Sequence, residues 1–154
     1  ANRELVYDAQ NRLTSVKLGG NTVAEFRYNA LGQRTQKITA QGTTTFLYGP
    51  DGQLLGEQQF NSQGTKLSGQ YYIWLDSMPL GGVSITFDAQ GAIASSEPFY
   101  LHSDHLNTPR KLSDSAGQTQ WQWPYSGFGE IGPQAVFLAA RIREGAQARA
   151  HRLA

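Results

Sequence analysis

Three side chains of the kinds that bind metals or transfer protons stand close together after residue 100. His102, Asp104 and His105 could offer two imidazoles and one carboxylate to a metal ion. On a strand, however, His102 and Asp104 would share one face while His105 lies on the other. Because their spacing also matches no metal-binding motif, we favour a polar turn in which Asp104 or Asn107 bonds backbone amides before Pro109. No metal site and no cofactor are therefore expected.

The same segment gives even less support to a nucleophilic catalytic site than to a metal site. Ser103 stands between His102 and Asp104, but adjacent strand residues point to opposite faces and cannot form a catalytic relay by themselves. The sequence holds no Gly-x-Ser-x-Gly elbow. Glycines between residues 125 and 129 suit a loop, yet no lysine follows at the spacing that a phosphate-binding loop needs. We expect no enzymatic activity from this chain.

A row of aromatic residues offers a different kind of site. Trp121, Trp123 and Tyr125 alternate with other residues, so on a strand all three would line one face. Such a face could stack on sugars or hold a peptide. More often it forms sheet core or a cross-strand aromatic ladder, which is the interpretation we favour. The binding face stays open as the alternative.

A five-residue pattern repeated along the chain predicts the elements that position these residues. An aromatic residue is followed by Asp, Asn or Gly, then by two variable residues, then by Gly or Asn. Five copies begin at Tyr7, Tyr28, Tyr48, Phe60 and Phe87, and a sixth, without the aromatic, begins at Ser113. The turn residues that we assign to these copies are Asp8, Asn11, Asn29, Gly32, Asp51, Gly52, Asn61, Gly64, Asp88, Gly91, Asp114 and Gly117.

Each position of the pattern suits a β-hairpin. The aromatic residue packs well on a half-buried pleated surface at the end of a strand. Asp or Asn bonds its own backbone and starts a turn, and Gly or Asn accepts the left-handed conformation that closes it. We therefore predict a type I turn followed by a left-handed residue in each copy.

The strands between the turns are predicted from alternation. Phe26 and Tyr28 share one face, as do Phe46 and Tyr48, which is typical of strands with one covered face. Successive copies begin 21, 20, 12, 27 and 26 residues apart. The average suits one hairpin per copy and disfavours a propeller, whose blades need about 40 to 45 residues. We predict an all-β chain of repeated antiparallel hairpins, with a degenerate spacing.

Composition excludes several classes of protein. The formal net charge of +1 over 154 residues gives no bulk electrostatic case for binding nucleic acid. The absence of cysteine excludes disulfides and thiolate metal sites. No apolar run is long enough to span a bilayer. The chain shows no signal peptide at Ala1 and starts inside a repeat, so we expect a fragment of a longer protein.

The character of the sequence changes after Glu130. We predict a repeat domain over residues 1–130 and a separate tail over residues 131–154, where alanine and arginine predominate. Ala135 to Arg143 favours a short helix, and the tail is expected to be helical or disordered. Its four arginines could attract nucleic acid or a membrane surface, but a solvated chain end is the simpler interpretation.

The segment from Tyr7 to Glu130 resembles the YD-repeat, or Rhs, family of large bacterial proteins. The copies at residues 7–13 and 28–34 are similar to the tyrosine-aspartate repeat of that family. The more specific similarity lies in the block Tyr100 to Arg110, which resembles a family segment near the end of the repeats, and in the following block Trp121 to Glu130.

The resemblance implies a long β-sheet that spirals into a hollow shell and encloses a C-terminal toxin or effector, in bacterial competition or toxin delivery. It implies that the partners are the chain's own toxin domain and neighbouring repeats, and that the parent is secreted or attached to the bacterial surface. A cell-surface module that binds carbohydrate or protein is the alternative. The self-cleavage motif of the family contains Asp-Pro, a dipeptide that this sequence lacks, so self-cleavage is not expected here.

Overall fold

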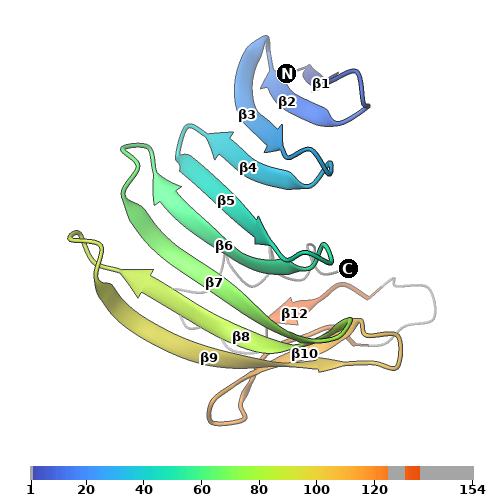
Figure 1. The fold of residues 1–154 in the computed structure, drawn as a ribbon, viewed down its shortest axis with the longest axis vertical. Helices are drawn as coiled ribbons and strands as arrows, with labels where there is room; N and C mark the ends of the chain where they lie inside the picture. The colour runs from blue at the N-terminus through green and yellow to red at the C-terminus, as the bar shows by residue number, and fades with distance from the viewer. Residues whose placement is uncertain (1, 125–130, 136–154) are drawn as a thin grey trace. The chain divides into compact units, whose positions relative to one another are not determined.

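The computed structural model describes residues 2–124 and 131–135 of the chain. In these residues twelve strands form one sheet, in which every strand lies beside its neighbours in the sequence (Figure 1). The prediction of an all-β chain built from antiparallel hairpins is confirmed. The strands are β1 (Arg3–Tyr7), β2 (Leu13–Leu18), β3 (Asn21–Tyr28), β4 (Arg34–Thr39), β5 (Gly42–Tyr48), β6 (Leu54–Asn61), β7 (Lys66–Leu75), β8 (Met78–Phe87), β9 (Ile93–Ser103), β10 (Pro109–Asp114), β11 (Thr119–Gln122) and β12 (Gln134–Ala135).

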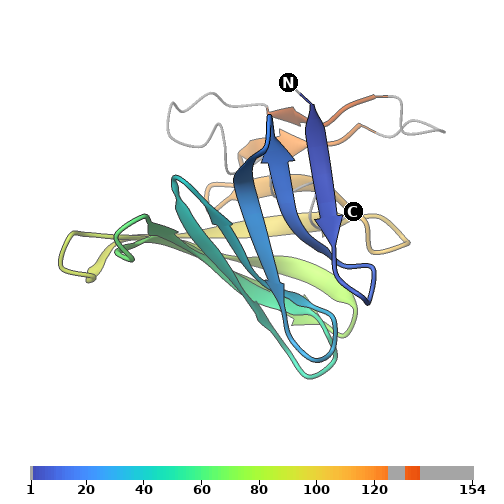
Figure 2. The ribbon, with the colours of Figure 1, turned by 90° about the horizontal axis from the view of Figure 1, so that it is seen from above.

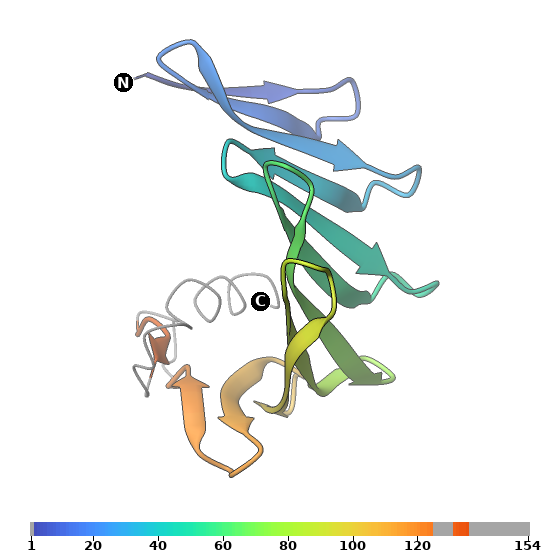
Figure 3. The same ribbon diagram turned by 90° about the vertical axis from the view of Figure 1, so that its left-hand side faces the viewer.

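The chain divides into two compact units. The first comprises residues 1–71 and 85–95, so it holds β1 to β6, most of β7 and the hairpin that joins β8 to β9. The second comprises residues 72–84 and 96–154, with β10 to β12. Within the first unit, β1 to β6 follow one another as a single twisted layer of strands (Figures 2 and 3).

The uneven spacing of the repeat pattern has a simple geometric cause in the first unit. The loops 8–11, 29–32 and 49–52 follow β1, β3 and β5 and therefore lie at the same end of the strands (Figure 1). Returning to that end takes two strands, which gives the spacings of 21 and 20 residues. The next copy follows β6 at the opposite end, only one strand later, hence the spacing of 12. The loops that carry the pattern thus recur regularly, and within this unit they move once from one end of the strands to the other.

A register shift accompanies the repeat loops. The pairing of β1 with β2 shifts between Val6 and Tyr7, and the pairing of β3 with β4 shifts between Arg27 and Tyr28. The same shift precedes the loops that follow β5, β6 and β10. Each shift is a β-bulge, which adds one residue to the strand that leaves the loop and increases the local twist.

A single layer buries few side chains completely. The most buried apolar side chains are Phe46, Tyr72, Phe99, Leu112 and Trp121, which are 4% to 7% exposed, and no large described side chain falls below 2%. Cross-strand pairs therefore carry more of the stabilisation than a closed core does. In the second unit, for example, the Tyr72 and Phe99 rings meet edge to face with centroids 6.1 Å apart.

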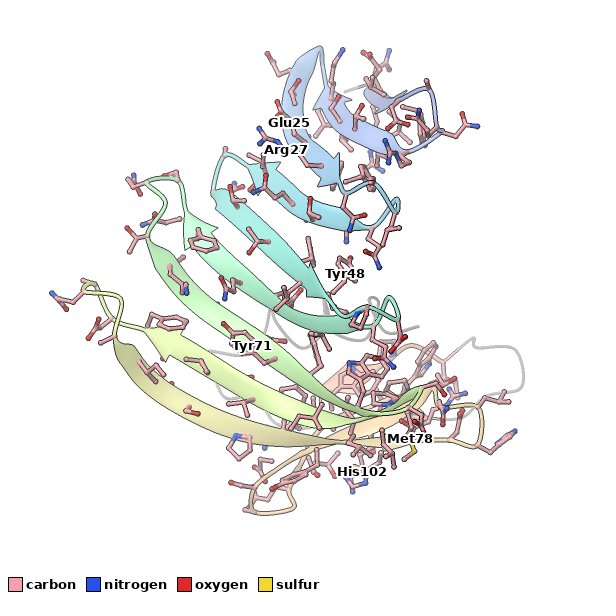
Figure 4. All side chains as sticks on the ribbon, in the orientation of Figure 1. Glu25, Arg27, Tyr48, Tyr71, Met78 and His102 are labelled. Atoms are coloured by element: carbon pink, nitrogen blue, oxygen red, sulfur yellow. The ribbon has the colours of Figure 1, made fainter. Side chains whose placement is uncertain are left out.

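Glycines allow one aromatic ring to lie flat on the sheet. A Cβ atom added to Gly56 would come within 2.8 Å of the Tyr71 ring, and one added to Gly69 within 2.9 Å. Tyr71 is paired with Gly56 across β6 and β7, and its hydroxyl accepts a 2.7 Å hydrogen bond from Gln58 Nε2 (Figure 4). The Tyr71 ring thus covers the backbone at Gly56 and Gly69, where no side chain stands in its way.

The predicted tail begins differently from the expectation. Gln134 and Ala135 form β12, which pairs with Gln122 and Trp121 of β11. The helix predicted to begin at Ala135 is therefore wrong at that residue, because pairing with β11 outweighs the helix propensity of alanine in a segment too short to form a stable helix by itself. The rest of that helix and of the tail lies outside the described residues. The boundary at residue 130 stays a prediction.

Candidate functional site

The repeat loops share one backbone hydrogen-bond pattern. In each, the N–H of the first loop residue donates to the carbonyl of the fifth residue, and the N–H of the fourth donates back to the carbonyl of the first, at 2.9 to 3.1 Å. The fourth residue has a positive φ, from +58° at Asn11 to +83° at Gly52. This is a type I turn closed by a left-handed residue. The described residues contain seven such loops, which start at Asp8, Asn29, Gly49, Asn61, Asp88, Asp104 and Asp114.

The side chain of the first residue closes the loop. In six of the seven loops its Oδ1 atom accepts the N–H groups of the third and fifth residues at 2.8 to 3.0 Å. Asp and Asn perform this role equally, because both present an oxygen at the same place. The loop beginning at Gly49 has no such oxygen. Asp51, which we assigned to this copy from the sequence, is its third residue.

Sequence analysis missed one of the seven loops. Asp104, His105, Leu106 and Asn107 follow the pattern, with Asn107 at a φ of +61°. The spacing Asp-x-x-Asn is the same as in Asp8 to Asn11 and could have identified it. Unlike each recognised copy, this segment lacks both the aromatic residue and the final Gly, with Ser103 and Asn107 in their places. The expected polar turn at Asp104 is present.

The predicted chemical cluster does not come together. The Oδ1 atom of Asp104 is engaged by its own loop, and its Oδ2 atom accepts a 2.8 Å bond from Arg110 Nε. His102 Nε2 lies 2.9 Å from Ser113 Oγ on the neighbouring strand, and His105 is an exposed loop residue. Over residues 2–124 and 131–135, no group of three or more His, Asp or Glu side chains could hold a metal ion.

Arginine lowers the pKa of two loop carboxyl groups. The hydrogen bond from the Arg12 main-chain N–H, aided by the Arg12 guanidinium, holds the pKa of Asp8 below its ordinary value. The hydrogen bond from the Arg110 guanidinium, aided by the N–H groups of Leu106 and Thr108, lowers the pKa of Asp104. Desolvation opposes both shifts without cancelling them. Both carboxyl groups therefore favour the charged form.

Tyrosine hydroxyls join successive repeats. Tyr28 Oη donates to the carbonyl of Leu13 at 2.8 Å, and Tyr48 Oη donates to the carbonyl of Arg34 at 3.1 Å. Leu13 and Arg34 are each five residues beyond the first residue of the preceding loop. Each hydroxyl bonds its carbonyl beyond the point where the backbone pairing of the two strands ends, β2 with β3 for Tyr28 and β4 with β5 for Tyr48.

The register distinguishes the junctions at Tyr28 and Tyr48 from the one at Phe60. The ladder of β2 and β3 ends at the pair Ser15 and Glu25, three residues before Tyr28, and β4 and β5 behave in the same way. By contrast, the ladder of β5 and β6 continues past Phe60 to the pair Gly42 and Asn61. The backbone pairing leaves no gap there for a tyrosine hydroxyl to bridge, so phenylalanine suffices.

Arginine side chains strengthen the same junctions. Arg12 pairs with Asp8 at 2.8 Å and places its guanidinium carbon 5.2 Å from the centre of the Tyr28 ring. Arg34 lies 4.8 Å from the centre of the Phe46 ring. In both cases an arginine that follows one loop covers an aromatic residue of the next strand, as a cation–π contact. Figure 4 shows Tyr48 at the loop end of β5, where this junction lies.

The aromatic row divides between two environments. Trp121 is 4% exposed and pairs with Leu112 across β10 and β11. Trp123 is half-buried; its ring lies 5.3 Å from the Arg110 guanidinium, and its Nε1 atom donates to the carbonyl of Ile131 at 2.6 Å. Tyr125 lies outside the described residues. The binding face assigned to these three residues stays a prediction.

This geometry defines a class of protein, the antiparallel repeat sheet whose hairpin loops share one hydrogen-bond pattern. Two family models match parts of the chain. A model described as RHS Repeat matches residues 7–44, and a model described as RHS protein matches residues 99–135. The predicted resemblance to the Rhs family is confirmed over these two segments.

One solved structure shares the fold. A chain of the Photorhabdus luminescens Tc holotoxin pore is 18% identical, with a TM-score of 0.58, over 86% of this chain and 7% of that chain. The crystal structure of TcdB2-TccC3-TEV matches at 14% identity and a TM-score of 0.45, over 75% of this chain and 8% of that chain. This chain thus spans a small part of the length of both. None of the curated proteins compared with it matches.

Proposed function

We propose that this chain is a wall segment of a β-sheet shell that encloses a C-terminal toxin or effector of a bacterial RHS-repeat protein. The observation that carries the proposal is the repeated junction, in which the Tyr28 and Tyr48 hydroxyls and the guanidiniums of Arg12 and Arg34 bind each hairpin to the next. The RHS family matches and the fold shared with the Tc holotoxin pore chain support it.

The physical properties of the sheet suit a wall. A repeat whose contacts reach only the neighbouring repeat can be added many times without a new core. The low net charge and the shortage of fully buried side chains fit a thin layer with two accessible faces. The proposed partners are therefore neighbouring repeats and an enclosed effector, in a protein secreted by bacteria or held at their surface.

The proposal assigns this segment a structural role and no reaction. His102 and Ser113 form a pair, but the carboxyl group of Asp104 is held by its own loop and by Arg110. The alternative of a carbohydrate-binding face draws less support, because the Trp121 ring is buried in the sheet. The described residues hold no helix long and apolar enough to cross a membrane.

Electron cryomicroscopy of the parent protein tests the proposal. We expect a closed hollow particle with the sheet as its wall and density for an enclosed domain. Limited proteolysis of the intact parent should spare that domain until the shell is unfolded. A solid globular particle, or an effector that is cleaved while the shell is intact, would refute the proposal.

A further inference from the structure

The contacts around Trp123 follow the same plan as the junctions between repeats. At the first junction, the loop carboxylate of Asp8 binds Arg12, and Arg12 covers the ring of Tyr28. The Tyr28 hydroxyl then donates to a main-chain carbonyl, that of Leu13. The junction thus combines a carboxylate, a guanidinium, an aromatic ring and a polar hydrogen carried by that ring.

The same four parts occur in the second unit. Asp104 Oδ2 accepts a 2.8 Å hydrogen bond from Arg110 Nε, and the Arg110 guanidinium carbon lies 5.3 Å from the centre of the Trp123 ring. A 2.7 Å hydrogen bond from the Trp123 main-chain N–H to the Arg110 carbonyl holds these two residues side by side. The indole Nε1–H then donates to the carbonyl of Ile131 at 2.6 Å.

The two junctions point in opposite directions along the sequence. Leu13 precedes Tyr28 by 15 residues, so the first junction ties a strand to an earlier one. Ile131 follows Trp123 by 8 residues and stands shortly before Gln134, where the pairing of β12 with β11 begins. The contact at Trp123 therefore ties the sheet to the chain that follows.

The pairing of β12 with β11 is too short to be stable by itself. It consists of two residue pairs, Trp121 with Ala135 and Gln122 with Gln134, and both residues of β12 are exposed. Two exposed residues bury little surface to offset the entropy lost when their backbone is ordered. A contact that fixes the chain just ahead of β12 lowers this cost, because it shortens the loop that the pairing must close.

We propose that a clamp made of Asp104, Arg110 and Trp123 positions β12 beside β11. The indole N–H of Trp123 makes the contact with the following chain, whereas Asp104 and Arg110 are positioning residues that hold the indole ring in place. The inference goes beyond the proposed function, since it concerns how residues 131–135 are held whether or not the sheet encloses an effector.

Two introduced thiols measure the pairing of β12 directly. Gln122 and Gln134 are opposite each other, and the Cα atoms of such pairs lie about 4.5 to 5.5 Å apart, within the range that a disulfide spans. Because the chain contains no cysteine, Gln122→Cys combined with Gln134→Cys allows a single disulfide within the chain. Its equilibrium with reduced and oxidised glutathione gives the effective concentration of the two thiols, which reports the fraction of molecules with β12 in place.

The variants are compared in this two-thiol background. Trp123→Phe keeps an aromatic ring beside Arg110 but removes the N–H donor, so we expect the effective concentration to fall about fivefold, the equivalent of one neutral hydrogen bond. Arg110→Gln should also lower it, because the indole ring is then no longer held. Once Trp123→Phe is present, adding Arg110→Gln should have little further effect, since the guanidinium acts through an N–H that is already absent.

Two substitutions serve as controls for the loss of a hydrogen-bond donor. Tyr28→Phe removes the matching donor of the first junction, which lies in the other unit. Tyr100→Phe removes the hydroxyl of a tyrosine that is 50% exposed in the same unit as the clamp. Both should leave the effective concentration of the two thiols unchanged.

An effective concentration that Trp123→Phe leaves unchanged would overturn the inference, as would effects of Trp123→Phe and Arg110→Gln that multiply independently. Circular dichroism shows whether each variant is folded. If Trp123→Phe does not fold, Arg110→Gln decides the inference, because an unchanged effective concentration in that variant would also overturn it. The shell experiment has a separate outcome, since a hollow parent particle is compatible with a β12 that is held in another way.

Discussion

At the scale of single residues, the tyrosine hydroxyls are the most specific contact between repeats. Each one satisfies a carbonyl group that the backbone ladder leaves open, so its loss should cost stability although no apolar surface is removed. We expect Tyr48→Phe to lower the free energy of unfolding by about 1 kcal/mol. Urea denaturation measures the change, with Tyr100→Phe as the control. A midpoint equal to that of the wild type would show that water replaces the hydroxyl without cost.

The loop carboxyl groups make stability depend on pH. Because the folded pKa of Asp104 is lowered, its charged form stabilises the fold above the ordinary pKa, and this stabilisation is lost as the pH falls through the folded pKa. Asp104→Asn keeps an oxygen for the two loop N–H groups, as Asn29 and Asn61 do, but loses the ion pair with Arg110.

Denaturation of the Asp104→Asn variant at two pH values isolates that ion pair. We expect the variant to be less stable than the wild type at pH 7 and to differ less from it at about pH 3, near the ordinary carboxyl pKa. The urea midpoints of both proteins at each pH provide the measurement. A difference in urea midpoint that is the same at both pH values would assign the effect of Asp104→Asn to the hydrogen bonds within the loop and not to the ion pair.

At the scale of elements, the residue types of the turns predicted the fold better than the composition of the strands. The left-handed positions at Asn11 and Gly32 follow from local sterics, and sequence alone located them. The loop at Asp104 was missed as a repeat because it lacks both the aromatic residue and the final Gly, although the hydrogen bonds need only the Asp and Asn. The junction carbonyls of Leu13 and Arg34 could not be predicted, since they depend on where the ladder between two strands ends.

The close approach of the Tyr71 ring to two glycines gives a prediction for β6 and β7. A methyl group at Gly69 would collide with the Tyr71 ring, whose hydroxyl is held by a hydrogen bond from Gln58. We expect Gly69→Ala to destabilise the chain by about 1 to 3 kcal/mol, the usual cost of overpacking. Gly132→Ala is the matched control, because a Cβ atom there meets no atom of the described residues within 4 Å. Thermal unfolding of both variants compares the two sites, and equal melting temperatures would contradict the close contact.

At the scale of the whole molecule, an open sheet must end in strand edges. Sequence predicted an array of hairpins, but the ends of the array have no local signal, since edge and central strands of a repeat share one pattern. A free edge presents unpaired N–H and C=O groups that pair readily with other chains. The isolated chain should therefore associate as its concentration rises.

A charge placed on the edge strand should reduce this association. Leu5→Lys puts a cation on β1 at a side chain that is already 46% exposed, and charged edge strands resist pairing with other edges. Leu31→Lys makes the same substitution in a loop, at a side chain that is 79% exposed, so net charge changes equally in both variants. Light scattering over a concentration series should show less association for Leu5→Lys than for Leu31→Lys. Equal association of the two would place the contact away from β1, and a wild-type monomer at every concentration would show that the open edge is protected.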